Sequence, residues 1–272
     1  MPDARGARAL FELLIDGVAF GVDLVFADVF QAIDRPDRLE AALWLETKQG
    51  GKGNPALDLG PGRSLAALLA GQQVFEGKVS RVSFALDGQL GKTISLVAYA
   101  EYHGLRALRR VDRYYQATDS EIAERIASEL GLMAVVERVE EVNPVVWREG
   151  DPLRFLRRRA EKRGFHLAVS GGKLYFGKRL PPLEWKGGEA LLLNGATELF
   201  SMEIGESGEG RRGRLEAPGN PGWRPLVSFE LGEPWSGPGR RGKRYQAIRT
   251  QHRLDSSGYQ TTVDFTEAEH DS

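Results

Sequence analysis

Apolar and polar residues alternate along much of the first hundred positions, as expected for strands with one buried face. In ALFELLIDGVAFGVDLVFADV, two strand-length runs are broken at Asp16-Gly17, a dipeptide typical of a tight hairpin. Further strands are predicted over 41–47, 74–86 and 92–99. Because most of these runs have a single apolar face, we expect them to close over one core as a sandwich or a small barrel.

The strand pattern returns from about residue 191. Strands are predicted in ELFSMEIGES, PLVSFELG, KRYQAIRTQHRL and GYQTTVDFTEA, with LDSSGY as the turn between the last two. Two segments rich in glycine and proline interrupt the strands. The first, 48–64, is predicted to be a long loop, and the second, 205–242, is predicted to hold a flexible loop or a small insertion.

Helical periodicity is confined to the middle of the chain, where a compact α+β module is predicted. In TDSEIAERIASELGL, Thr118 and Glu121 have the spacing of a capping box at the start of a helix. A second helix is predicted from Asp151, its N-cap, to Gly164. The hairpin that follows is predicted to turn at Gly171-Gly172.

The second helix is strongly basic. Its sequence, DPLRFLRRRAEKRG, places arginines and lysines around an apolar stripe of Leu153, Leu156 and Ala160. A phosphate-binding patch would use such a density of guanidinium groups. Charged residues are also the normal composition of the solvated face of an amphipathic helix, and Asp151 and Glu161 lie among the cations. We therefore interpret the basic face as solvated or partner-facing, and as a docking surface in preference to a phosphate site.

Composition removes several classes of function. The chain of 272 residues contains no cysteine, which excludes disulfides, thiolate zinc sites and cysteine-ligated iron–sulfur clusters. The net charge of −1, from 37 basic and 38 acidic residues, argues against a protein whose main task is to coat nucleic acid. No run of about 18 apolar residues occurs, and the N-terminal residues lack the order of a signal peptide, so neither a membrane span nor a secretion signal is expected.

No catalytic or cofactor-binding constellation is recognisable in the sequence. The histidines have no zinc-protease spacing, and we interpret His166 and His252, which fall in predicted strands, as structural. GQLGKT resembles only the end of a phosphate-binding loop, and the strand-like ISLVAY follows it in place of a helix. There is neither a Gly-x-Ser-x-Gly elbow nor a carboxylate pair in a glycosidase context. The sequence therefore predicts no enzymatic activity, no cofactor and no metal.

The order of the motifs is more informative than any one of them. VFEGKVSRVSF and ISLVAYAEYHGLRAL are followed by YYQATDSEIAERIASELGL, WREGDPLRFLRRRAEKRGFHLAVSGGKLYFGK and YQAIRTQHRLDSSGYQTTVDF. This series, over about residues 10–266, resembles the baseplate hub proteins of contractile phage tails, the late control gene D family. It is also similar to the hub portion of the VgrG spike proteins of type VI secretion and of extracellular contractile injection systems.

The resemblance implies a mainly β fold in which two tube-type β-barrel domains flank a small α+β module. The first barrel domain is then expected at 8–108, and the α+β module, with two helices and a β-hairpin, at 109–188. The second barrel domain is expected at 189–267, with the Gly/Arg/Pro-rich insertion at about 205–242, followed by a tail at 268–272.

The resemblance also implies a task, that of a structural baseplate hub. Three copies of such a chain place six barrels in a ring, which adapts a hexameric tail tube to a trimeric spike. The implied partners are two further copies in a homotrimer, the tail tube protein on one face, a spike protein on the other, and other baseplate proteins. The implied location is the baseplate of a virion tail or of an injection particle, after synthesis in the bacterial cytoplasm. Because the sequence stops soon after the second barrel, without glycine-rich β-helix repeats, the trimeric spike is expected to be a separate polypeptide.

Candidate docking residues come from the basic helix and the two glycine-rich segments. They are Arg154, Arg157, Arg158 and Lys162 of the helix, Lys52 and Arg63 of the first segment, and Arg211, Arg212 and Trp223 of the second. For the two loops, solvent-exposed linkers are the alternative.

Two other functions compete with the hub. One is a nucleic-acid or anionic-polymer binding module that uses helix 152–163 and RRGRLEAPGNPGWRP, against which the near-zero net charge and the lack of interleaved aromatic residues argue. The other is a cell-wall hydrolase, for which no acid–base pair is recognisable.

Overall fold

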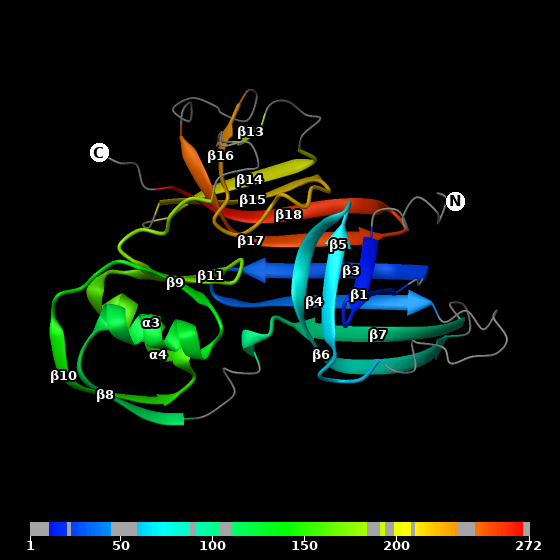
Figure 1. Ribbon diagram of the computed structural model, residues 1–272. Coiled ribbons are helices and arrows are strands. Elements are labelled where there is room, and N and C mark those ends of the chain that lie inside the picture. Colours follow the sequence, from blue (N-terminus) through cyan, green and yellow to red (C-terminus); the bar gives the residue numbers. More distant parts are fainter. Residues whose placement is uncertain are drawn as a thin grey trace. The chain divides into compact units, whose positions relative to one another are not determined.

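The structure is a computed structural model that divides into two compact units (Figure 1). The larger unit comprises the described residues within 1–31, 37–100 and 183–272, and the smaller unit those within 32–36 and 101–182. The described residues are 11–20, 23–44, 59–87, 91–103, 110–183, 191–193, 199–207, 210–232 and 243–268.

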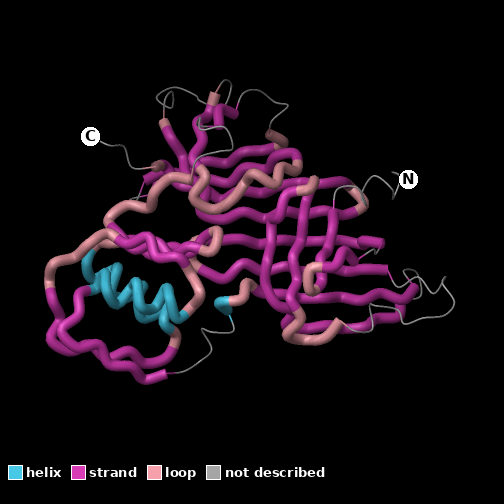
Figure 2. The backbone as a smooth tube through the Cα atoms, in the orientation of Figure 1, coloured by secondary structure: helices cyan, strands magenta, loops and turns pink. Residues whose placement is uncertain are grey.

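Both β parts of the chain contribute strands to the larger unit. The N-terminal strands are β1 (Phe11–Ile15), β2 (Val18–Phe20), β3 (Asp23–Ala32), β4 (Arg35–Trp44), β5 (Ser64–Leu69), β6 (Gln72–Asp87) and β7 (Gly91–Tyr99). The C-terminal strands are β13 (Leu191–Leu193), β14 (Ser201–Ser207), β15 (Gly210–Pro218), β16 (Ser228–Leu231), β17 (Arg244–Asp255) and β18 (Gly258–Glu267). Within the described residues they form one 13-stranded sheet in the order β14-β15-β18-β17-β3-β4-β7-β6-β5-β1-β2, with β16 also paired to β17 and β13 to β16 (Figure 2).

Alternating burial explains why these segments are strands. In β5, the buried positions alternate with more exposed ones and are Leu65, Ala67 and Leu69. The strands enclose two hydrophobic cores, one for each β part. The second core is aromatic, and in it the ring of Phe229 contacts the rings of Trp223, Tyr245 and Phe265. The first core includes Leu254 of β17, so a C-terminal strand completes the N-terminal core.

Strands β3 and β17 join the two halves of the sheet. Two side-chain hydrogen bonds supplement their pairing: Gln251 Nε2 donates to Asp28 Oδ1 at 3.1 Å, and Thr250 Oγ1 donates to Gln31 Oε1 at 3.4 Å. The mainly β character predicted from the sequence is confirmed. The two β parts share one sheet, and their division into two barrel domains stays a prediction.

Helices lie between two small sheets in the smaller unit (Figure 1). The helices are α3 (Asp119–Glu129) and α4 (Pro152–Arg163). One sheet pairs β8 (Arg110–Thr118) with β10 (Val142–Gly150), and the other has the order β11 (His166–Ser170), β12 (Lys173–Gly177) and β9 (Met133–Val136). The buried residues of α4 include the predicted stripe of Leu153, Leu156 and Ala160.

The ends of both helices follow local signals in the sequence. Thr118 Oγ1 accepts a hydrogen bond from Glu121 N at 3.2 Å, and Glu121 Oε2 accepts one from Thr118 N at 2.8 Å, so the predicted capping box is confirmed. Asp151 accepts hydrogen bonds from the first turn of α4, and Gly164 ends that helix with a φ of 66°. The predicted hairpin turn at Gly171-Gly172 is confirmed, and both glycines have positive φ.

One segment differs from the sequence prediction. A flexible loop or small insertion is predicted over 205–242, but Gly210–Pro218 is strand β15, which pairs with β14 on one side and β18 on the other. Only Leu215 and Ala217 of this strand are buried apolar residues. Its glycines and arginines therefore do not give the alternation of apolar and polar residues by which a strand is predicted. Residues 233–242 of the same segment lie outside the described residues.

Candidate docking surfaces

Part of the basic face of α4 is turned inward, against a carboxylate of α3. The Nε atoms of Arg159 and Arg163 both donate to Asp119, whose side chain is 2% exposed. Arg159 also donates to Asn143 Oδ1 at 2.7 Å, and Arg163 pairs with Glu141 Oε2 at 3.1 Å. Hydrogen bonding to Asp119 raises the pKa of Arg163. These two arginines hold the smaller unit together and are not available to a partner.

A second group of cations on α4 faces solvent. Arg154, Arg158 and Lys162 are exposed and are spaced four residues apart, which places them in one row along the helix. None of the three side chains has an ion-pair partner in the described part of the chain. Arg154 lies in the first turn, where a positive charge opposes the helix dipole. Lys162 lies in the last turn, where a positive charge is favourable. The helix dipole thus accounts for Lys162 but not for Arg154, and the exposed row is consistent with a docking role.

Two other predicted docking residues, Arg157 of α4 and Arg63 of the first glycine-rich segment, already have intramolecular contacts. Arg157 Nη2 donates to the backbone oxygen of Asp34 at 2.8 Å. Arg63 precedes β5, and its Nε pairs with Asp16 Oδ2 at 2.5 Å, so it fastens the tip of the β1–β2 hairpin. Lys52 lies outside the described residues.

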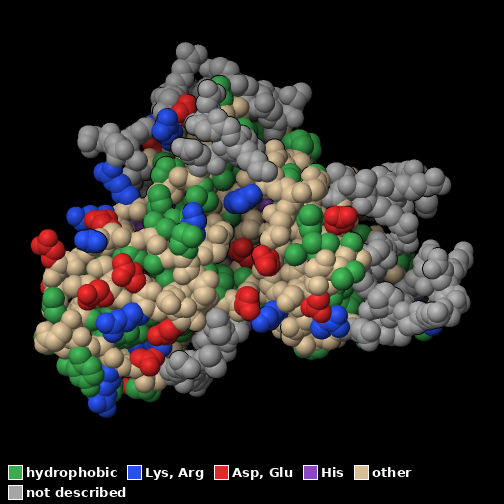
Figure 3. Space-filling model, in the orientation of Figure 1, with side chains coloured by type: hydrophobic (Ala, Val, Ile, Leu, Met, Phe, Trp, Pro, Cys, Tyr) green, Lys and Arg blue, Asp and Glu red, His purple; other side chains and the backbone are tan. Residues whose placement is uncertain are grey.

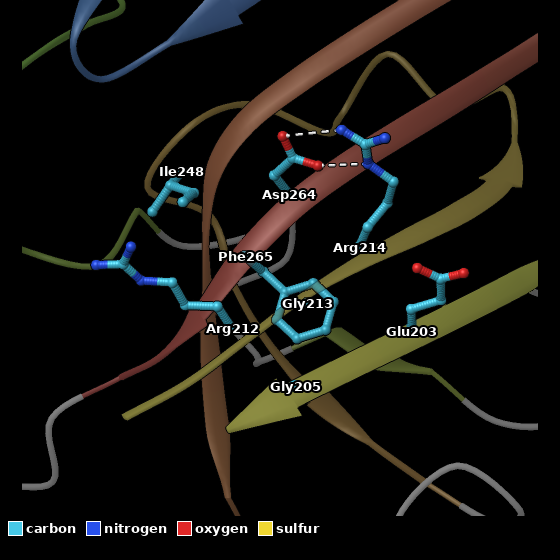
Figure 4. A pocket seen from close by; sticks show the side chains of 8 residues that line it. All are labelled: Glu203, Gly205, Arg212, Gly213, Arg214, Ile248, Asp264 and Phe265. Carbon is cyan, nitrogen blue, oxygen red and sulfur yellow. Dashed lines mark hydrogen bonds and ion pairs between the residues drawn. The ribbon is translucent and has the colours of Figure 1, made fainter. Parts of the chain in front are cut away.

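Arg212 lines an open depression of about 410 Å³ in the sheet of the larger unit (Figure 4). Arg214 on the same strand donates to Asp264 from Nε at 2.7 Å and from Nη2 at 3.4 Å, and Arg249 approaches the same carboxylate at 3.1 Å. Because two guanidinium groups already engage Asp264, this carboxylate is not a free acid or base. The Nε atom of the neighbouring Arg211 lies 3.9 Å from Glu267 Oε2.

Trp223 is a core residue and not a docking residue. Its side chain is 2% exposed and packs edge-on against Phe229. Its backbone oxygen accepts a hydrogen bond from His252 Nε2 at 3.0 Å, while His252 Nδ1 lies 2.9 Å from Tyr259 Oη. Since a carbonyl oxygen only accepts, Nε2 carries a proton, and in the neutral imidazole Nδ1 accepts from the hydroxyl of Tyr259. Burial lowers the pKa of His252 to about 4, so the prediction of a structural histidine is confirmed.

The sequence reading missed one exposed surface, on the two-stranded sheet of β8 and β10. Four apolar side chains lie exposed on its outer face: Val111, Tyr115, Val145 and Trp147. Hydrophobic side chains are visible at the surface over these strands, at the lower left of Figure 3. The signal available in the sequence was the strand-like run VVWREG before the basic helix, in which the apolar residues Val145 and Trp147 alternate with Val146 and Arg148.

The described residues contain no group of three or more histidine, aspartate or glutamate side chains that could hold a metal ion. None of their helices is long and apolar enough to cross a membrane.

Comparison with solved structures finds this fold elsewhere. The 43 kDa tail protein of prophage MuSo2 from Shewanella oneidensis superposes with a TM-score of 0.69 at 13% identity, over 94% of this chain and 96% of that one. The chain has the fold of a phage tail protein. The tail protein from Neisseria meningitidis MC58 matches with a TM-score of 0.68 at 13% identity, over 95% of this chain and 96% of that one.

The same fold occurs in a secretion machine. An E. coli protein described as a component of the type VI secretion system, with structural similarity to the T4 bacteriophage tail proteins gp27 and gp5, matches with a TM-score of 0.72 at 13% identity. The match covers 95% of this chain and 77% of that one. No protein-family model and no curated protein sequence matches the chain. At this level of identity the likeness concerns the fold.

Proposed function

We propose that the protein is a structural, non-enzymatic baseplate hub of a contractile tail or injection machine. Three copies form a ring with pseudo-six-fold symmetry that adapts a hexameric tail tube to a trimeric spike. The observation that carries this proposal is the larger unit, in which two β parts, each with its own core, continue one sheet through β3 and β17. Two such parts per chain give three copies six similar lobes. The likeness in fold to phage tail proteins and a type VI secretion component supports it.

Docking to neighbouring baseplate proteins is assigned to the exposed row of α4. Arg154, Arg158 and Lys162 offer three cations that have no ion-pair partner among the described residues, so the expected contact is an acidic surface of a neighbouring protein. Arg157, Arg63, Arg211 and Arg212 have internal contacts and are expected to contribute at the rim of an interface. A nucleic acid is the competing anionic partner, and it loses support because Asp119 already occupies Arg159 and Arg163.

The first experiment measures the mass of the purified chain in solution, alone and then mixed with a candidate trimeric spike protein from the same genome. A trimer in either case, seen by electron microscopy as a ring of six similar lobes, is the expected result. A chain that stays monomeric with the spike protein and shifts on addition of DNA would contradict the hub and favour the nucleic-acid alternative.

A second experiment tests the row on α4. Arg158→Gln removes its central cation, and Arg125→Gln removes an exposed arginine of α3 as the matched control. We expect Arg158→Gln to reduce incorporation of the chain into assembled baseplates, measured by pull-down of the tagged chain, while Arg125→Gln leaves it unchanged. Equal incorporation of both variants removes the row from the docking surface.

A further inference from the structure

The outer face of the two-stranded sheet of β8 and β10, hereafter the ribbon, is apolar where a solvent-facing surface is normally polar. Direct cross-strand partners lie on the same face, and the pairs on the outer face are Val111 with Glu149, Arg113 with Trp147 and Tyr115 with Val145. Tyr115 is 58% exposed and Trp147 is 50% exposed. Contiguous exposed apolar side chains of this size typically mark an interaction site.

The inner face of the ribbon is buried and combines an apolar pair, Tyr114 with Val146, with a buried ion pair. Arg148 is 2% exposed; it pairs with Asp112 directly across the ribbon and with Glu129 of α3 at 2.7 Å. The inner side chains therefore already supply the core contacts of the ribbon, while Tyr115 and Trp147 on the outer face are exposed. The apolar outer face is therefore not accounted for by the packing of the smaller unit.

The centre of the outer face combines three residue types that dominate protein interfaces. The guanidinium of Arg113 lies 3.8 Å from the ring centroid of Trp147, and its Nη1 donates to Tyr115 Oη at 3.4 Å. Trp, Tyr and Arg are the residues most enriched at interface hot spots. Arg113 has no carboxylate partner among the residues that the structure describes. Stacking leaves its remaining N–H donors in the plane of the guanidinium, where a carboxylate can accept two of them.

We propose that this face binds a short segment of a partner protein, which lays apolar side chains on Trp147, Tyr115 and Val145 and places a carboxylate on Arg113. The size of the ribbon favours a short segment over a second copy of the chain. Two strands of nine residues cover roughly 300 Å², whereas a stable dimer buries about 800 Å² on each partner. A nucleic acid fits less well, because it needs a positively charged groove along its backbone, whereas the paired residues of this face carry one cation, Arg113, and one anion, Glu149. The inference goes beyond the proposed hub function and does not require the ring.

Selection from a random library of nine-residue peptides tests the proposal on the full chain. We expect the wild-type chain to enrich peptides that combine aliphatic or aromatic residues with an aspartate or glutamate. Trp147→Ala is expected to weaken binding of the selected peptide at least tenfold. Phe200→Ala, which removes an aromatic residue of similar exposure from the other unit, is the matched control and is expected to leave binding unchanged.

The carboxylate contact is tested separately by a double exchange. Replacing the acidic residue of the selected peptide by its amide is expected to lower the affinity for the wild-type chain about tenfold. The same replacement is expected to leave the affinity for the Arg113→Gln variant unchanged. No enriched peptide, or a peptide that binds Trp147→Ala as well as wild type, overturns the proposal. Two other results also overturn it. If the chain binds a twelve-nucleotide single-stranded DNA and Trp147→Ala abolishes that binding, the face belongs to nucleic acid. If the chain self-associates and Trp147→Ala abolishes the association, the face belongs to a second copy.

Discussion

Acid is expected to destabilise the larger unit through one buried side chain, His252. The imidazole is 1% exposed, and burial favours its neutral form, in which Nε2 donates to the backbone oxygen of Trp223 and Nδ1 accepts from Tyr259. Burial lowers its pKa from 6.5 to about 4, and the positive charge of nearby Arg224 acts in the same direction. In the unfolded chain the same group is protonated below about pH 6.5. Between these two values the unfolded chain binds the additional proton, so stability falls as the pH is lowered.

The magnitude follows from the size of the pKa shift. Each pH unit across this window removes about 1.4 kcal/mol from the free energy of unfolding. From pH 7 to pH 4.5 the loss is therefore about 2.5 kcal/mol, and below about pH 4 no further loss arises from this group. Since whole domains are stable by roughly 5–15 kcal/mol, one histidine accounts for a substantial share of the acid sensitivity.

The assay is urea unfolding at pH 7 and pH 4.5 for the wild type and for His252→Gln, followed by circular dichroism. Glutamine offers hydrogen-bonding groups but does not titrate, so the variant is expected to lose about 2.5 kcal/mol less than the wild type between the two pH values. Other groups, such as Asp28, whose pKa is raised by burial, and Asp255, whose pKa is lowered by hydrogen bonds from Ser257, titrate in both chains and cancel in the difference. Equal pH dependence in both chains would refute the reasoning.

Three further substitutions test the packing by thermal or urea unfolding. Asp119→Asn leaves the two inward-facing arginines, Arg159 and Arg163, without their carboxylate and is expected to destabilise the smaller unit by about 3 kcal/mol. The control Glu124→Gln, on the exposed face of α3, is expected to change its stability by less than about 0.5 kcal/mol. Equal effects would show that Asp119 does not hold the two helices together. Gly213→Ala places a Cβ 2.4 Å from the backbone oxygen of Glu203 and is expected to lower the free energy of unfolding by about 1–3 kcal/mol. The control Gly205→Ala, which has open space around its Cβ, is expected to be near neutral. A neutral Gly213→Ala would show that the strands relax at this position. Thr118→Ala removes the capping box and is expected to cost about 1 kcal/mol, and no loss would mean that solvent replaces the cap.

The features that could be predicted from the sequence are those with local causes. The capping box of Thr118, the N-cap of Asp151 and the turn at Gly171-Gly172 each depend on residues within a few positions, and each was predictable at its residue. Long strands with regular alternation, such as β6 and β7, were predictable for the same reason.

Features that depend on distant pairing were not predictable. Strand β15 is specified by its neighbours β14 and β18, and its own glycine- and arginine-rich sequence indicates a loop. The counterion of Arg159 and Arg163 is Asp119, which lies 40 and 44 residues away along the chain. The sequence of the basic helix therefore gives no sign that two of its cations have an internal partner. The division of its cations into an inward pair and an outward row depends on the packing of α3 against α4, which the sequence does not specify locally. The sequence around Trp223 indicates a loop, whereas the core that encloses its side chain is assembled from separate strands.

The pairing of β3 with β17 has a consequence for the order of events during synthesis. Residue 32 ends the first of these strands and residue 244 begins the second, and Leu254, which lies in the N-terminal core, follows later still. A ribosome that adds about 5–20 residues per second needs roughly 10–40 s to make the intervening chain. During that interval β3 has an open edge and the first core is incomplete, whereas the smaller unit is completed once residue 182 has been added, before β17 begins. Nascent chains are therefore exposed to edge-to-edge association for most of the time that they take to emerge.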